Sequence, residues 1–164
     1  MSRRGLFMTG GAGGVMTTPH DLTSNQGPHF ILSASSRLGV GADGGSLAYY
    51  TMNGSHMAPY AFHTEYEDHP WWQIAFDRAV ELLNIDFWWR GDDSWGLGGT
   101  DFILQYSDDG ENFADVLPFS VEMAYDGPLT KIPVENAGRH RYWRITGDFG
   151  DYMIIGELEL TYRR

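Results

Sequence analysis

Alternation of apolar and polar residues in the second half of the chain restricts its fold more than any other feature. In LLNIDFWWR, residues 82–90, the odd-numbered residues from Leu83 to Trp89 are apolar, and the even-numbered residues from Asn84 to Arg90 are mostly polar. Successive side chains of a strand point to opposite faces of a sheet, so this spacing predicts a strand with one buried face. We expect the odd-numbered side chains, Trp89 included, to face a core, and Trp88 to share the other face with Arg90.

Other segments have a similar character, and turn residues separate them. The predicted strands cover residues 29–35, 71–76, 82–90, 101–107, 120–124, 129–134, 140–146 and 157–162. Ser107-Asp108-Asp109-Gly110 follows one of them and is typical of a hairpin turn. No stretch has the period of a helix. The sequence therefore predicts an all-β fold, an antiparallel β-sandwich of about eight strands.

Glycine and proline indicate how the chain is organised. Residues 1–28 are rich in Gly, Thr, Ser and Pro, and we interpret them as an N-terminal arm. Residues 29–164 then form one sandwich domain, with a long Gly-rich loop at 39–54. A chain of 164 residues is long enough to bury a substantial core. At least one of Trp71 and Trp72, at the start of a predicted strand, is expected in that core.

Composition excludes several functions. The net charge of −11 repels phosphate backbones, so we expect no nucleic-acid partner. No apolar run is long enough for a transmembrane helix, and the N-terminus lacks the apolar region of a signal peptide. Cysteine is absent, which excludes disulfides and thiolate chemistry. No nucleophile elbow, P-loop, dinucleotide fingerprint or zinc motif appears, so we expect no enzyme.

Five segments, in this order, resemble the discoidin or coagulation factor 5/8 type C superfamily, which has a galactose-binding-like jelly roll. They are PWWQIAF, LLNIDFWWR, DFILQYSDDGENF, RYWRIT and IIGELELTY. The resemblance covers roughly residues 29–162 and implies a jelly-roll sandwich whose binding loops gather at one end. It favours an extracellular or cell-surface location, although the residues themselves leave the location unknown.

A narrower resemblance links His63-Thr64 before Pro-Trp-Trp, and Arg90-Gly91-Asp92, to the fucose-binding F-type lectins. In that family a His, this Arg and a later basic residue surround the sugar. Here DDSWGLGG follows Arg90-Gly91 without a basic residue, and Asp93-Ser94 stand in place of the family's cysteine pair. The resemblance thus implies a sugar site and leaves the sugar unnamed.

The candidate ligand-binding residues suit a pyranose. The fork of Arg90 donates to paired hydroxyls, and neutral His63 offers one donor and one acceptor. Arg90 also has Asp92, Asp93 and Asp68 as alternative ion-pair partners, and His69 or His56 are weaker alternatives to His63. The full set predicted to bind ligand is His63, Arg90, Asp92, Trp95, Phe149 and Tyr152, the last three as loop aromatics that stack on the sugar.

The superfamily resemblance also implies a structural Ca²⁺. Glu157 opens the last predicted strand, where relatives place a calcium ligand, and Asn53-Gly54 lies where they often have Asp-Gly-Asn. Asp43-Gly44 is an alternative anchor. Ca²⁺ requires six to eight oxygens, many of them backbone carbonyls that a sequence does not reveal.

These observations predict a carbohydrate-binding module or lectin that recognises a monosaccharide or glycan terminus. The alternative is a protein-interaction or assembly module on the same fold with no sugar ligand. A membrane partner is not expected because the chain is acidic, and a homo-oligomer would supply avidity to a weak site. Paired carboxylates, Asp92-Asp93 or Glu65-Glu67-Asp68, would be the candidates for glycoside hydrolysis, but no spacing rule brings them face to face.

Overall fold

The computed structural model describes residues 14–37, 47–55, 61–89, 99–122, 129–147 and 150–164. These residues form strands and one short 3₁₀ helix. In chain order the elements are β1 (Val15–Thr17), β2 (Phe30–Ala34), η1 (Ala48–Met52), β3 (Phe62–His63), β4 (Glu67–Asp68), β5 (Trp71–Trp88), β6 (Asp101–Ser107), β7 (Ala114–Ser120), β8 (Leu129–Pro133), β9 (Arg139–Gly147), β10 (Gly150–Asp151), β11 (Ile154–Ile155) and β12 (Glu157–Arg163). The predicted all-β sandwich is confirmed.

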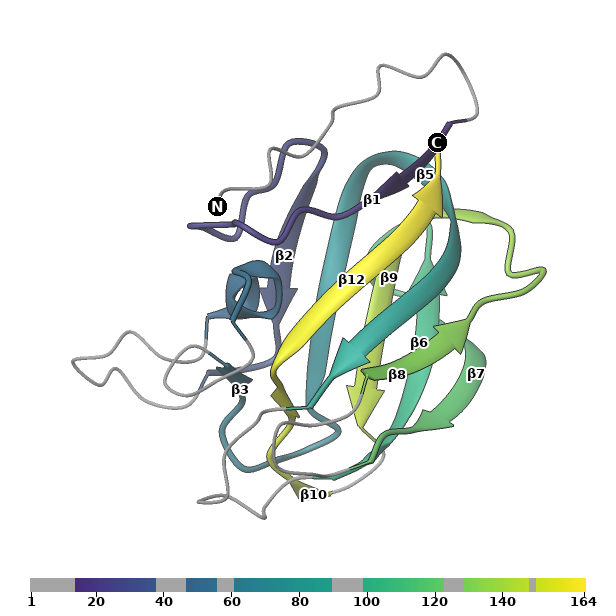
Figure 1. Cartoon of the computed structure of the whole chain (residues 1–164). Helices are drawn as coiled ribbons and strands as arrows, with labels where there is room; N and C mark the ends of the chain where they lie inside the picture. The colour runs from purple at the N-terminus through teal and green to yellow at the C-terminus, as the bar shows by residue number, and fades with distance from the viewer. Residues whose placement is uncertain (1–13, 38–46, 56–60, 90–98, 123–128, 148–149) are drawn as a thin grey trace.

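Strand β5 belongs to both layers of the sandwich. Its first part, up to Phe76, pairs with β2 and β9, and β9 continues through β6 to β7. Its second part, from Glu81, pairs with β12 and β8, and β12 pairs with β1. All of these pairings are antiparallel. Figure 1 shows β5 passing between the layers, with β12 and β8 in front of β9 and β6. We call the β2–β5–β9–β6–β7 side layer A and the β1–β12–β5–β8 side layer B.

The prediction of two separate strands at 71–76 and 82–90 is therefore wrong in one respect. Asp77 and Arg78 do not end the first strand; the extended backbone continues through them while the register with β9 shifts between Ala75 and Val80. Both side chains are exposed at this bend. Strands that change sheets through such irregularities are a known way of making the corners of a sandwich.

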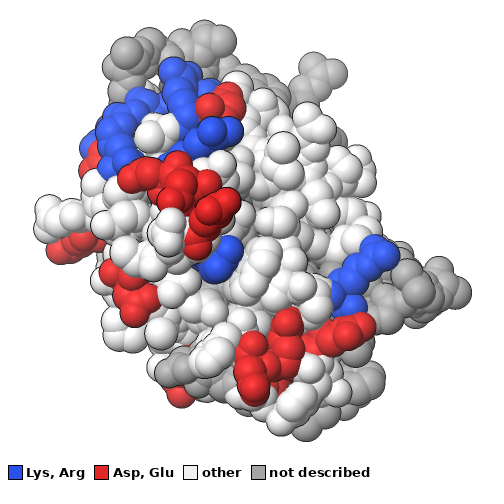
Figure 2. Space-filling model, turned by 180° about the vertical axis from the view of Figure 1, so that it is seen from behind, with Lys and Arg blue, Asp and Glu red and all other residues white. Residues whose placement is uncertain are grey.

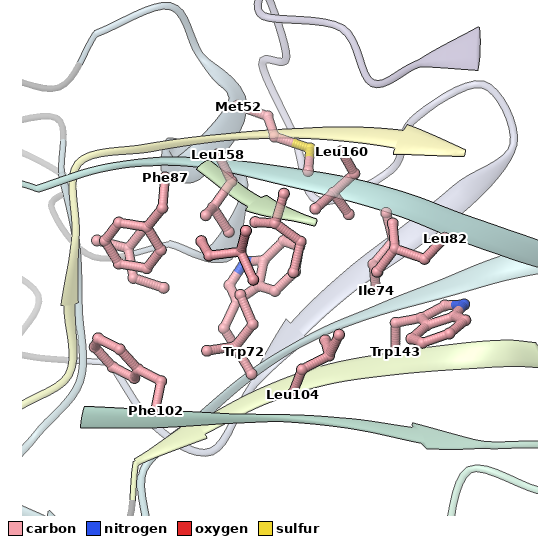
Figure 3. Packing of buried hydrophobic residues seen from close by; sticks show 14 of the residues in the cluster. Met52, Trp72, Ile74, Leu82, Phe87, Phe102, Leu104, Trp143, Leu158 and Leu160 are labelled. Carbon is pink, nitrogen blue, oxygen red and sulfur yellow. The ribbon is translucent and has the colours of Figure 1, made fainter. Parts of the chain in front are cut away.

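The core fills the space between the two layers (Figure 3). Trp72, Trp143, Phe76, Phe87 and Phe102 are among its largest fully buried side chains. The expectation that at least one of the paired tryptophans is buried holds, because Trp72 is buried whereas Trp71 points to the other face.

One predicted core position is wrong. Leu82, not Leu83, is buried, because the register with β12 shifts next to it: Leu82 is opposite Tyr162, whereas Asn84 is opposite Thr161. The extra residue in β5 turns Leu83 out of the core. Beyond the bulge Ile85, Phe87 and Trp89 follow the predicted alternation.

The predicted hairpin at Ser107 is confirmed. Asp109 accepts backbone hydrogen bonds from Glu111 and Asn112, and the Gly110 amide donates to Ser107 Oγ at 3.0 Å. The strand predicted at 120–124 is displaced, because β7 begins at Ala114 and ends at Ser120. This edge strand contains Pro118 and buries little, so no alternation marked it in the sequence.

The chain before β2 contributes to the sandwich from Val15 onward, although residues 1–28 were interpreted as an arm. β1 pairs with β12, and Thr18 extends this pairing by donating its amide to Leu160 O and accepting the Leu160 amide at its hydroxyl, at 3.0 and 2.9 Å. Within the predicted Gly-rich loop, η1 packs on the core and its Ala48 carbonyl accepts the Trp72 indole N–H. No helix among the described residues is long and apolar enough to span a membrane.

Candidate functional site

Two short strand pairs extend one end of the sandwich. β3 pairs with β11, and β4 pairs with β10. This end lies opposite the one at which β12 and β1 meet near the C-terminus (Figure 1). β3 and β4 lie directly before β5, and β10 and β11 lie directly before β12. Their pairing therefore holds in place the segments that lead into β5 and β12. We call this the loop end.

An aromatic cluster stands at the loop end. The rings of His63 and Tyr152 lie 5.0 Å apart between centroids, and Tyr152 meets Tyr66 edge to face at 5.6 Å. The Tyr66 side chain is mostly in solvent, with 65% of its surface exposed. Edge-to-face contacts stabilise aromatic pairs, so the exposed ring is held in place by its partially buried neighbour. The structure thus brings together two predicted residues, His63 and Tyr152, and adds Tyr66.

Tyr66 was missed because the segment TEYED around it is acidic and has no periodicity. Among the Phe, Trp and Tyr residues that the structure describes, Tyr66 has the largest exposed fraction. Its exposed position between two strand pairs marks Tyr66 as a candidate binding residue, and this position can be seen only in the structure.

His63 is buried, with 4% of its surface exposed. Its Nδ1 lies 2.7 Å from the Thr64 carbonyl oxygen, and its backbone pairs with Ile154 in β11. The ring therefore supports the floor of the cluster, below Tyr152. Arg90, Asp92, Trp95 and Phe149 lie outside the described residues, so the structure does not place these four predicted side chains. The weaker alternative His56 also lies outside them.

Backbone hydrogen bonds anchor the described residues that flank the segments 90–98 and 148–149. The Gly99 amide donates to Tyr152 O at 3.3 Å, and the Gly147 amide donates to Pro70 O at 2.8 Å. The Gly156 amide donates to Trp88 O at 3.0 Å, and a Cβ on Gly156 would lie 2.7 Å from Trp89 O. A close backbone approach that only glycine allows therefore joins the end of β5 to the start of β12.

The carboxylate of Glu67 is engaged in hydrogen bonds that hold the loop end together. Glu67 Oε1 accepts hydrogen bonds from the hydroxyls of Ser35 and Ser36, at 2.6 and 2.5 Å. Ser36 Oγ also accepts the amide of Glu65. These bonds tie β4 to the chain that follows β2, and they give Glu67 a positioning role at the loop end.

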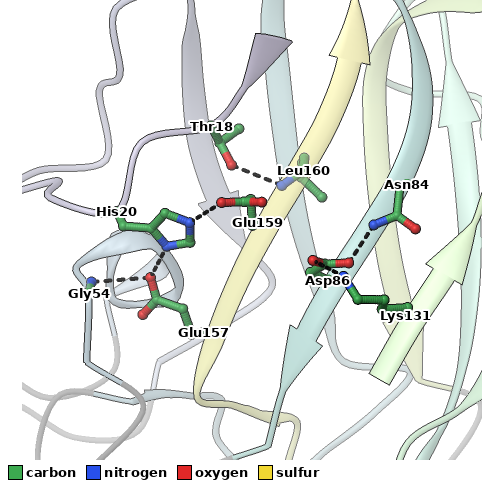
Figure 4. Close-up of polar contacts among 9 residues, drawn as sticks. All are labelled: Thr18, His20, Gly54, Asn84, Asp86, Lys131, Glu157, Glu159 and Leu160. Carbon is green, nitrogen blue, oxygen red and sulfur yellow. Dashed lines mark hydrogen bonds and ion pairs between the residues drawn. The ribbon is translucent and has the colours of Figure 1, made fainter. Parts of the chain in front are cut away.

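A polar cluster around His20 joins the turn after η1 to Glu157 and Glu159 of β12 (Figure 4). Both ring nitrogens of His20 face carboxylates: Nδ1 lies 2.8 Å from Glu157 Oε1, and Nε2 lies 2.5 Å from Glu159 Oε2. The hydrogen bond with Glu157 is the largest cause of a His20 pKa raised to about 9; burial opposes it and Glu159 adds to it. The pKa of buried Glu157 is also raised, mainly by desolvation. His20 is thus the counter-ion of both carboxylates.

The predicted calcium residues meet in this cluster. The Gly54 amide donates to Glu157 Oε1 at 3.1 Å, and Asn53 Oδ1 accepts the Ser55 amide at 2.9 Å. Gly54 has a left-handed φ of 81°, and a Cβ there would lie 2.6 Å from His20 O, so the Asn53-Gly54 turn requires glycine. Asp43-Gly44, the alternative anchor, lies outside the described residues.

The residues of this cluster offer some of the oxygen ligands that a cation would need. Glu157 Oε2 is buried and has no hydrogen-bond partner among the described residues. A buried carboxylate oxygen without a partner carries a desolvation cost that a hard cation would remove. Over the same part of the chain, no group of three or more His, Asp or Glu side chains gathers as a complete metal site. Glu157 and Asn53 are the described residues that would hold Ca²⁺, and the ion would link this turn to β12.

Comparison with known families decides the classification. Residues 51–145, more than half of the chain, match the family of NedA-like, galactose-binding domains of the F5/8 type C group. The chain belongs to this family. The superfamily resemblance inferred from the five segments is therefore confirmed.

Several solved structures have a similar fold. A structure described as CpGH89CBM32-5 from Clostridium perfringens, in complex with GalNAc-beta-1,3-galactose, has a TM-score of 0.65 and 20% identity, covering 80% of this chain and 94% of that one. The family 32 carbohydrate-binding module of C. perfringens NanJ, in complex with galactose, has a TM-score of 0.62 and 15% identity, covering 89% and 99%.

The fucolectin of striped bass, Morone saxatilis, has a TM-score of 0.62 and 17% identity, covering 81% of this chain and 45% of that one. At these identities the likeness is one of fold. No curated protein sequence matches the chain significantly.

Proposed function

We propose that this F5/8 type C domain is a non-catalytic carbohydrate-binding module that recognises a monosaccharide or glycan terminus at the loop end. The observation that carries the proposal is the exposed ring of Tyr66, braced edge-on by Tyr152 above buried His63. A pyranose presents an apolar C–H face, and a fixed aromatic ring at a loop edge is suited to stack on it.

The sugars bound in two of the similar structures support a saccharide as the ligand. One neighbour is a complex with GalNAc-beta-1,3-galactose and another a complex with galactose. In our proposal Tyr66 stacks on the sugar ring, while Arg90 and Asp92, which the sequence assigns to the site, meet its hydroxyls. A single shallow site of this kind binds weakly, with a Kd on the order of micromolar to millimolar, or about 4–8 kcal/mol.

Binding to a glycan array tests the proposal. The wild-type protein, displayed multivalently in Ca²⁺ buffer, is expected to retain at least one class of glycan, and Tyr66→Ala to lose it. Glu135→Gln is the matched control because this side chain is exposed and lies outside both the loop end and the polar cluster around His20 and Glu157. If no glycan is retained, or if Tyr66→Ala binds as well as the wild type, the proposal is wrong. A protein-interaction module would then be the better interpretation.

We also propose a structural Ca²⁺ held through Glu157 Oε2 and Asn53 Oδ1. The unpartnered, buried Oε2 supports it. Ca²⁺ bound only to the folded state would raise the melting temperature relative to EDTA buffer, and Glu157→Gln would remove this difference. Equal melting temperatures in Ca²⁺ and EDTA would contradict the proposal without affecting the sugar site.

A further inference from the structure

The outer face of layer A contains a groove that is not lined by the aromatic cluster of the loop end, His63, Tyr66 and Tyr152. Its volume is about 430 Å³, within the range of small-molecule sites. The lining residues come from β5, β6, β7, β9 and the segments before β5 and β7, and include Trp71, Gln105, Glu111, Phe113, Asp115 and Arg144. His69, the weaker alternative to His63, also lines the groove, and no other lining residue belongs to the predicted sugar site. Figure 2 shows, on the face of the molecule seen from behind, groups in which basic and acidic side chains adjoin, with uncharged surface between these groups.

Strand register builds a polar row across this face. Ser33, Gln73 and Arg144 are neighbours across β2, β5 and β9, and Arg144 is opposite Gln105 in β6. Gln105 is opposite Asp115 and donates its amide to Oδ1 at 2.8 Å. The row is thus fixed by backbone pairing, which places its hydrogen-bonding groups at regular intervals across the sheet.

Arg144 is the most constrained of these side chains. Its guanidinium carbon lies 4.3 Å from the centroid of the Trp71 ring and 3.5 Å from that of Phe113. Its Nε and one terminal nitrogen donate to Gln73 Oε1, at 3.2 and 2.8 Å. Among the described residues, the other terminal nitrogen has no hydrogen-bond partner. An arginine clamped between two rings loses little conformational entropy when a ligand accepts its remaining N–H groups.

The charges around the groove select against ionic ligands. Arg144 disfavours a cation, and the carboxylates of Glu111 and Asp115 disfavour an anion. The remaining surface consists of aromatic and aliphatic side chains next to amide and hydroxyl groups. This combination matches a neutral ligand with many hydroxyls and apolar ring faces. An open groove, unlike a pocket closed at one end, admits the internal residues of a chain.

From this arrangement we propose that the groove is a second saccharide site, which takes the internal residues of a neutral linear oligosaccharide. Arg144 covers one face of the Trp71 ring and one of the Phe113 ring, so in this proposal their opposite faces and edges contact the apolar faces of the sugar rings, while Arg144 and Gln105 bind hydroxyls. Such a site would let one domain bind along a polysaccharide as well as at its end. It functions independently of the loop end, and its ligand need not be the same.

Nuclear magnetic resonance titration tests the proposal with cellohexaose, xylohexaose and mannohexaose as separate probes. The reporters are the Trp71 indole N–H and the Arg144 Nε–H. We expect at least one hexasaccharide to shift both reporters in a saturable way, and Phe113→Ala to weaken that binding about tenfold, a typical loss for a stacking residue. Gln105→Ala serves as a second groove variant if Phe113→Ala fails to fold.

The design separates this site from the loop end. Tyr66→Ala and the exposed control Glu135→Gln should leave the affinity in the groove within about twofold of wild type, since neither side chain lines the groove. The proposal is overturned if none of the hexasaccharides shifts the two reporters, or if Phe113→Ala and Gln105→Ala bind as well as the wild type. Shifts that depend on protein concentration instead of added sugar would indicate self-association and would overturn it as well.

Discussion

The ring of Tyr66 meets that of Tyr152 edge to face, 5.6 Å between centroids, although the two residues belong to segments that are far apart in the sequence. The pairing of β4 with β10 brings these segments together. Asp68 in β4 pairs with Gly150, where a Cβ would lie 2.9 Å from Asp68 Oδ1 and 3.9 Å from Tyr66 OH. The absence of a side chain at Gly150 therefore leaves the space that Asp68 and Tyr66 occupy.

Tyr66→Ala should reduce glycan affinity about tenfold or more while changing the free energy of unfolding by less than about 0.5 kcal/mol, as is typical of exposed positions. The physical reason is that the ring is mostly in solvent and stabilises the bound sugar more than the fold. Isothermal titration calorimetry and urea denaturation measure the two effects. A large loss of stability would instead identify Tyr66 as part of the packing of the loop end.

His63→Ala should behave differently, with a loss of about 1–3 kcal/mol in stability together with weaker glycan binding. The side chain is buried, and its removal leaves Tyr152 without its support and Thr64 O without the hydrogen bond from Nδ1. Urea denaturation provides the stability, and calorimetry the affinity. Unchanged stability with complete loss of binding would show that His63 acts by touching the sugar.

Replacement of His20 tests the charge balance on β12. His20→Ala removes the donors to Glu157 and Glu159 and leaves a buried carboxylate without its counter-ion, so it should cost about 1–3 kcal/mol in EDTA buffer. His20→Gln retains one donor and should lose less. Equal stability of both variants and the wild type in urea denaturation would show that the two carboxylates need no partner.

Asp109 should make the β6–β7 hairpin sensitive to acid. Hydrogen bonds from Asn112, from Glu111 and from Ser107 hold the pKa of this carboxyl well below its usual value of 3.8. A group whose pKa is lower in the folded state stabilises above its unfolded pKa and loses that contribution as the pH falls. Stability should therefore decline as the pH is lowered below about 4.

Asp109→Asn should flatten the acid limb of this stability profile, whereas Glu111→Gln, a change in a neighbouring exposed carboxylate, should preserve it. Urea denaturation at a series of pH values measures both. If the Asn variant keeps the full acid dependence of the wild type, other carboxylates are responsible for it.

Most of the fold was predictable because burial of one strand face leaves an alternating pattern, as in 101–107 and 157–162. Errors occurred where backbone irregularity breaks that pattern. Asp77 and Arg78 resemble the end of a strand, although the strand only changes layers there. Leu83 was assigned to the core because a bulge next to Leu82 cannot be read from spacing.

The candidate site was predictable to a smaller extent. The sequence brought out His63 and Tyr152, which the structure places in contact, but not the exposed Tyr66 between them and solvent. The groove was also missed. Gln73, Arg144 and Gln105 lie far apart along the chain, and only strand register makes them neighbours.

The passage of β5 between the layers has a consequence for how the protein reaches its native state. Most contacts in the sandwich join residues distant in the chain, so folding must close long loops before it gains much burial. Because one strand is central to both layers, neither layer has its complete set of neighbours without the other. We therefore expect docking of the layers and ordering of β5 to be one event, so that the groove and the strand pairs of the loop end are lost together in a single cooperative transition.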